Sequence, residues 1–83
     1  EREEMQMDYV IKGTKTVQEF KDVRASMEKR AERYSKKHMS ACENWQEGLP
    51  VRCWRGSFGV LWIEYESGKC WQYRETSLGI EWY

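Results

Sequence analysis

The first hydrophobic pattern along the chain has a period of two and predicts a short strand. Apolar side chains alternate with residues that are mostly polar, which is typical of a strand with one buried face. The apolar positions are Met5, Met7, Tyr9 and Ile11. Gly13 ends the alternation. Residues 1–4 are charged, and we expect them to fray.

A segment with a helical period follows from Thr16. Thr16 and Glu19 have the spacing of a capping box, in which the first side chain accepts from an early backbone N–H and the second reaches back. Apolar residues then recur at steps of three and four, which keeps them on one side of a helix. Gly48 and Pro50 are residues that end helices, so the predicted helix continues almost to them. The stripe consists of Val17, Phe20, Arg24, Met27, Ala31, Tyr34, His38, Ala41 and Trp45.

The part of the sequence after Pro50 predicts a β-meander. Runs of β-branched and aromatic residues alternate with turns that contain Gly and Ser, as in antiparallel strands. The predicted strands cover residues 51–55, 58–66, 70–75 and 80–83. We therefore predict that residues 1–83 form a single small α+β domain. It has a short N-terminal strand and one long amphipathic helix, which packs on an antiparallel meander of three to four strands.

The turn at Gly68 predicts which side chains share a face of the sheet. A three-residue loop with Gly68 in the left-handed conformation places Ile63 opposite Trp71 and Leu61 opposite Tyr73. This register collects apolar side chains on one face, whereas a two-residue loop mixes them, so burial favours the first. The predicted core face holds Leu61, Ile63, Tyr65, Trp71 and Tyr73. The other face, of mixed character, holds Val60, Trp62, Glu64, Cys70, Gln72 and Arg74.

The turn at Gly56 extends this prediction to the preceding strand. The sequence RGSF has Gly first in its central pair, which suits a tight type II′ hairpin. Such a hairpin places Trp54 opposite Gly59 on the core face. It also places Cys53 opposite Val60 on the mixed face.

Trp62 is the large aromatic residue that this arrangement leaves on the mixed face, beside Gln72 and Arg74. One interpretation is that another part of the chain or a second copy covers it. The other is that it anchors a partner, because Trp with Arg nearby is the composition of interface hot spots.

The charges add a second candidate surface. Fourteen Lys and Arg residues balance fourteen Asp and Glu residues, which argues against a general polyanion binder. The basic excess lies in the helix, where Arg30, Arg33 and Lys37 are spaced to share one face. That face is either simply solvated or contacts phosphates or an acidic protein. Strands can also read DNA, and the residues suited to that role are Arg52, Arg55, Arg74 and Gln72.

The titratable residues give no pattern typical of an enzyme or a metal site. His38 and Cys42 stand four apart on the helix, but no closely spaced cysteine pair completes a zinc site. They are also the sole candidate for a catalytic dyad, and a third group to orient them is missing from the pattern. We therefore predict no catalytic residues, no metal and no cofactor. The spacing of Cys53 and Cys70 in the predicted sheet also disfavours a disulfide between them.

Three cysteines are an odd number, which argues against a secreted disulfide scaffold and favours a reducing cytoplasm. The sequence has no apolar run long enough to span a bilayer. We also expect the helix to be about twice as long as the strands, so that it cannot lie wholly over the sheet. It should therefore either kink near Ser40 or leave one end, with Phe20, Tyr34 or His38, for a partner to cover.

These patterns together predict a non-enzymatic small binding protein that acts through protein–protein contacts. It would be an adaptor or an inhibitor, of the kind that phages and mobile elements encode, although no residue shows such an origin. Its partner would be another protein or a second copy, with no small-molecule substrate and no membrane. The alternative is a nucleic-acid-binding module that uses the basic helix face, and salt dependence distinguishes the two. The candidate partner-binding residues are Trp62, Gln72, Arg74, Arg30, Arg33 and Lys37.

Overall fold

The computed structural model describes residues 7–83, which form one helix and a five-stranded sheet. The elements in chain order are β1 (Asp8–Val10), α1 (Val17–Ala41), β2 (Pro50–Arg55), β3 (Leu61–Tyr65), β4 (Cys70–Thr76) and β5 (Gly79–Trp82). The strands lie in sequence order, with β1 parallel to β2 and all other neighbours antiparallel. The predicted α+β fold is confirmed, with four strands in the meander and β1 at its edge. The predictions for Met5 and residues 1–4 lie outside the described residues.

Helix α1 begins where the capping pattern predicts. The backbone N–H of Glu19 donates to the Thr16 hydroxyl at 3.0 Å. The Glu19 carboxylate accepts from the backbone N–H of Lys15 at 2.8 Å, one residue earlier than in a standard capping box. Together these bonds satisfy two backbone donors at the start of the helix.

The helix ends at Ala41, so the prediction that it continues almost to Gly48 is wrong. Trp45 lies outside the helix but still contacts the core. Its ring centroid lies 4.8 Å from that of His38 and 4.9 Å from that of Tyr65. Its indole N–H also donates to the Gly48 carbonyl at 2.7 Å. The helix therefore ends earlier than predicted, and the Trp45 ring packs on the core from the loop that follows it.

One face of the sheet packs on α1 and forms the core. Its paired side chains follow the predicted register of β3 and β4, with Leu61 opposite Tyr73 and Ile63 opposite Trp71. Gly68 has a φ of +94° and closes the connecting turn as predicted. Trp71 is half-buried and packs against this cluster. The fully buried core consists of Met27, Ala31, Tyr34, Cys53, Leu61, Ile63, Tyr65 and Tyr73.

The predicted register of β2 and β3 is wrong. Cys53 lies opposite Ile63 and is buried in the core, while Trp54 lies opposite Trp62 on the other face. The connection is a 3₁₀ turn, Ser57–Gly59, and not a tight hairpin. Because side chains alternate along a strand, this difference exchanges the environments of the thiol and the indole.

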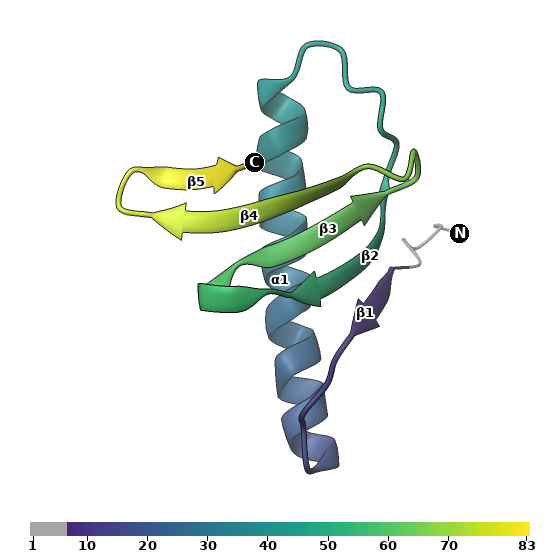
Figure 1. Cartoon of the computed structure of the whole chain (residues 1–83), viewed down its shortest axis with the longest axis vertical. Coiled ribbons are helices and arrows are strands. Elements are labelled where there is room, and N and C mark those ends of the chain that lie inside the picture. The colour runs from purple at the N-terminus through teal and green to yellow at the C-terminus, as the bar shows by residue number, and fades with distance from the viewer. Residues whose placement is uncertain (1–6) are drawn as a thin grey trace, which may run out of the picture.

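Helix α1 extends beyond the sheet at its N-terminal end (Figure 1). Val17 and Phe20 are 72% and 41% exposed there, and the first fully buried helical side chain is Met27. Tyr34 and His38, by contrast, are buried under the sheet. The overhang that we predicted from the lengths of the elements is therefore present at the end that carries Phe20. Within residues 7–83, no helix combines the length and the apolar character needed to cross a bilayer.

Candidate functional site

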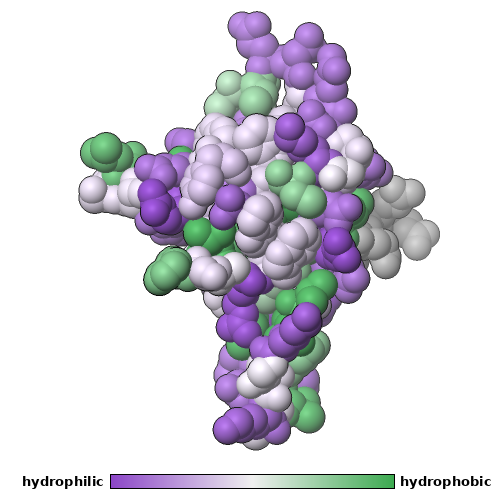
Figure 2. Space-filling model, in the orientation of Figure 1, coloured by the Kyte–Doolittle hydropathy of each residue, from purple (hydrophilic) through white to green (hydrophobic). Residues whose placement is uncertain are grey.

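The face of the sheet opposite α1 is not covered by any element of residues 7–83, and we call it the outer face. Figure 1 looks onto it, with the sheet in front of the helix. The strand registers place one transverse row of side chains across it, which is Val10, Trp54, Trp62, Gln72 and Tyr83. In Figure 2 the middle of this face has intermediate hydropathy and is bordered by hydrophilic side chains.

Trp54 and Trp62 form a stacked pair at the middle of the outer face. Their ring centroids are 5.8 Å apart and their planes differ by 7°. The guanidinium of Arg52 lies over the Trp54 ring at 5.0 Å from its centroid. A Cβ added to Gly56 would lie 2.8 Å from the Trp62 indole nitrogen, so the absence of a side chain at Gly56 leaves room for this ring. Trp62 is thus held in place and half-buried by its own chain.

The arginines beside this pair carry their own counterions. Arg52 pairs with Glu64 at 2.9 Å, and Arg74 pairs with Glu81 at 2.8 Å. Arg74 also lies 6.0 Å from the ring centroid of Tyr83. The outer face therefore combines a rigid aromatic centre with locally neutralised charges.

Three of the predicted site residues come together on this face. Trp62 lies directly opposite Gln72, and Arg74 is the next outward-facing residue of β4. Trp54 belongs to the same surface, although we predicted it to be in the core. The signal that could have placed it is the sequence between β2 and β3, which is long enough for a wider turn as well as for a tight one.

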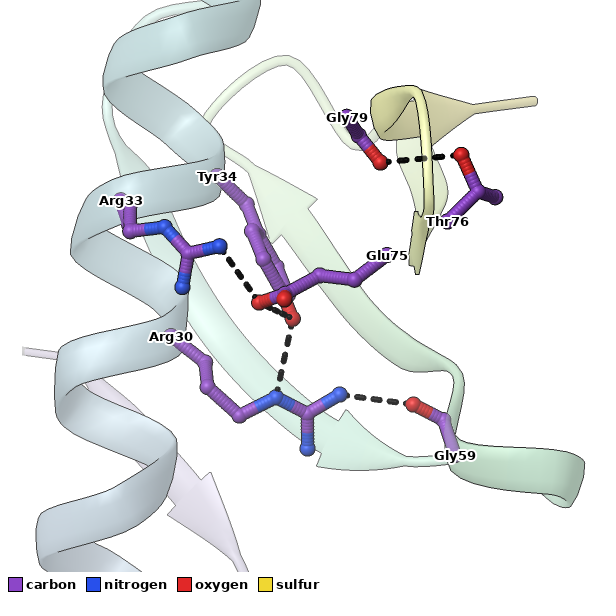
Figure 3. Close-up of polar contacts among 7 residues, drawn as sticks. All are labelled: Arg30, Arg33, Tyr34, Gly59, Glu75, Thr76 and Gly79. Atoms are coloured by element: carbon purple, nitrogen blue, oxygen red, sulfur yellow. Dashed lines mark hydrogen bonds and ion pairs between the residues drawn. The ribbon is translucent and has the colours of Figure 1, made fainter.

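The other predicted site residues, Arg30, Arg33 and Lys37, lie on α1, on the helix side of the sheet. The Arg33 guanidinium pairs with the Glu75 carboxylate at 2.7 Å, and the Tyr34 hydroxyl donates to the same carboxylate at 2.9 Å (Figure 3). The hydrogen bond from Tyr34, with Arg33 beside it, lowers the pKa of Glu75. Lys37 is exposed. Arg33 therefore joins the helix to β4 and is not a free cation.

Arg30 likewise spans from the helix to the sheet. Its Nε donates to the Tyr34 hydroxyl at 3.1 Å, and its Nη2 donates to the Gly59 carbonyl at 2.7 Å (Figure 3). Arg33 and Lys37 thus do not share a surface with the outer face, whereas Arg30 reaches the turn between β2 and β3 that borders it.

His38, the residue we considered as a metal ligand or base, is enclosed by aromatic rings. Its Nδ1 lies 2.7 Å from the Tyr73 hydroxyl, and its ring stacks on Trp82 at 4.3 Å. Trp71 and Trp45 contact it edge-on. Burial lowers the pKa of His38, so the neutral imidazole is favoured.

The three cysteines are free thiols in different environments. Cys42 and Cys70 are half-buried, while Cys53 is fully buried. Burial raises the pKa of the Cys53 thiol to about 12, which disfavours the reactive thiolate. Within residues 7–83 no cluster of three metal-ligating side chains occurs.

Comparison with protein-family models, curated proteins and solved structures gave no match to this chain. Its function is therefore inferred from the geometry and chemistry of the outer face.

Proposed function

We propose that this chain is a non-enzymatic binding protein whose outer face docks onto another protein. The observation that carries the proposal is the stacked pair of Trp54 and Trp62 at the centre of an uncovered sheet face. Large aromatic residues with neighbouring arginine dominate the binding energy of protein interfaces. Because the chain already holds both rings in place, these two side chains lose little conformational entropy when a partner binds.

The charges of the outer face support a protein partner over a nucleic acid. Arg52 and Arg74 are each paired with a glutamate, so a phosphate backbone would have to pass close to carboxylates. The two indoles are in contact with one another, which leaves no space for a base to enter between them. Proteins that bind single strands instead offer free aromatic faces along a positively charged groove.

We also propose a reducing compartment such as the cytoplasm, and the role of an adaptor or an inhibitor. The free state of Cys42, Cys53 and Cys70 supports the first. The combination of a small domain with one uncovered aromatic face supports the role of an adaptor or an inhibitor.

Affinity capture from host lysate with matched variants tests the proposal. The full chain and its Trp62→Ala and Phe20→Ala variants are used as baits, and bound proteins are quantified by mass spectrometry. Phe20 is the control because it is an exposed aromatic residue on the overhanging end of α1. A specific partner should be reduced roughly tenfold or more by Trp62→Ala, which is the range of an interface hot spot, and kept by Phe20→Ala.

Two further measurements define the alternatives. Light scattering shows whether the partner is a second copy, since self-association should then also be lost with Trp62→Ala. Salt titration shows whether phosphates are involved, because phosphate contacts weaken steeply with salt. If the partner is lost only with Phe20→Ala, or if all captured material is nucleic acid, the proposed docking on the outer face is wrong.

A further inference from the structure

A hollow of about 760 Å³ adjoins the outer face where β1 and β2 end. Trp54 lines it, so it is continuous with the tryptophan pair. Four of its lining residues are cations and none is acidic, and these cations are Lys12, Arg30, Arg52 and Arg55. We call this hollow the basic pocket. It has the size of ordinary ligand pockets, which range over roughly 300–1,000 Å³.

Most of the positive charge of the basic pocket has no carboxylate bonded to it in the described structure. Arg52 pairs with Glu64. Arg55 donates to the backbone carbonyl of Lys12 at 3.2 Å, and Arg30 donates to the carbonyl of Gly59 and to a tyrosine hydroxyl. A guanidinium carries five N–H donors, so these neutral acceptors leave donors free at Arg30 and Arg55. Converging cations of this kind attract an anionic group.

The turn that borders the basic pocket has an unusual conformation. Phe58 lies between Gly56 and Gly59, which line the pocket, and it has a φ of +57° and a ψ of +38°. Bulky side chains rarely adopt this left-handed region. Phe58 is also 99% exposed, so no burial against residues 7–83 compensates for the strained backbone. Strain of this kind clusters at sites that contact ligands.

A second exposed hydrophobic residue lies at the same end of the strands as Phe58. Leu78 is 97% exposed at the turn between β4 and β5. Figure 1 places this turn and the turn after β2 at one end of the strands, and Figure 2 shows hydrophobic groups over both. The end of the sheet that carries the basic pocket therefore also carries two apolar side chains that residues 7–83 leave almost fully exposed.

From this arrangement we infer that the basic pocket binds carboxylates of an acidic segment of the partner protein, while Phe58 contacts apolar side chains next to that segment. The inference rests on the proposed function, whose partner it describes. A nucleic acid that reached both the pocket and the tryptophan pair would bring phosphates close to Glu64. A protein segment can carry acidic residues at one end only, so it fits a basic pocket beside a neutral face.

Amide NMR titration of the full-length protein with defined anions tests the inference. The probes are a six-residue glutamate peptide, inorganic pyrophosphate and an oligothymidylate. The peptide should shift the backbone amides of Gly56 and Gly59. The double variant Lys12→Gln with Arg55→Gln should weaken its binding by roughly fivefold, since it removes two exposed ion pairs. The matched double variant Lys21→Gln with Lys29→Gln should leave binding unchanged, because both side chains are exposed on α1 and neither lines the pocket.

Three outcomes would overturn the inference. The peptide could leave both glycine amides unmoved, or both double variants could weaken binding equally, which would mean that the attraction is general. Pyrophosphate or oligothymidylate could bind roughly tenfold tighter than the peptide, which would make the pocket a phosphate site. These outcomes are separate from a failure of the proposed function. The capture experiment separates the two. A partner that is lost with Trp62→Ala but kept by the double variant Lys12→Gln with Arg55→Gln would support docking on the outer face and rule out the basic pocket as part of it.

Discussion

Removal of the Tyr73 hydroxyl should destabilise this protein more than removal of the Tyr65 hydroxyl. The two hydroxyl oxygens lie 2.6 Å apart, and the Tyr73 oxygen also lies 2.7 Å from Nδ1 of His38. All three side chains are at most 1% exposed. The Tyr73 hydroxyl is therefore the central member of a buried chain of three polar groups.

The expected magnitudes follow from this position. Tyr73→Phe leaves both the Tyr65 hydroxyl and the His38 ring nitrogen without a partner, and each such group costs about 1–3 kcal/mol. Tyr65→Phe leaves Tyr73 bonded to His38, so only one net hydrogen bond of about 0.5–1.5 kcal/mol is lost. We expect Tyr73→Phe to lower the free energy of unfolding by at least about 0.5 kcal/mol more than Tyr65→Phe does, and by about 3 kcal/mol more at the middle of both ranges. That is a large share of the roughly 5–15 kcal/mol of a whole domain.

Urea unfolding followed by circular dichroism measures these differences. The double variant Tyr65→Phe with Tyr73→Phe should be no less stable than Tyr73→Phe, because it also removes the hydroxyl that the single change leaves unpaired. The two substitutions should therefore be strongly non-additive. If Tyr65→Phe destabilises as much as Tyr73→Phe, or if the two effects simply add, the Tyr73 hydroxyl does not have this central position.

Two other predictions concern His38 and the strained turn. Burial lowers the pKa of His38 in the folded state. Below the unfolded value of about 6.5, the unfolded chain therefore binds a proton that the folded chain does not, and the free energy of unfolding falls. The melting temperature should thus fall between about pH 7 and pH 5, and His38→Gln should reduce that fall; an equal fall in the variant would contradict the assignment. At the turn, Phe58→Asn should raise the free energy of unfolding by about 0.5–1 kcal/mol, because asparagine tolerates the left-handed region and the exposed ring contributes little to the fold. A lower melting temperature in calorimetry would show instead that the Phe58 ring stabilises the folded chain.

How well the sequence predicts the sheet differs between the turn at Gly68 and the turn at Gly56. At Gly68, one register separates apolar from mixed faces, so burial and turn chemistry agree and the prediction is correct. At Gly56 the turn chemistry suggested a tight hairpin that the chain does not form. Trp54 pairs with Trp62, three positions beyond the predicted partner Gly59, and an odd shift exchanges the two faces.

Sequence patterns cannot measure the volume available in the core. Cys53 and Trp54 are neighbours, and either could have faced α1. The core already holds the rings of Tyr34, Tyr65 and Tyr73, and the small thiol occupies the remaining position. The choice depends on three-dimensional packing, which periodicity does not contain.

The end of α1 shows the same limitation. Glu43, Gln46 and Glu47 favour a helix past Ala41, but Cys42 and Asn44 do not, and propensity is in any case a weak preference that tertiary contacts override. The Trp45 ring contacts His38 and Tyr65 from the segment that follows the end of the helix. Aromatic packing and the bond from Trp45 to the Gly48 carbonyl thus replace the last predicted turns.

Two departures from sequence rules that no packing among residues 7–83 explains lie close together. Phe58 occupies a strained backbone conformation with its ring in water, and Arg55 donates to a backbone carbonyl and, within residues 7–83, to no carboxylate. The early end of α1, by contrast, is compensated by contacts within the core. In a sequence that otherwise agrees with its fold, uncompensated violations mark functional positions. Phe58 and Arg55 both lie at the end of the outer face that carries the basic pocket, so the docking that we propose there would account for both, whereas stability alone would favour another residue at position 58.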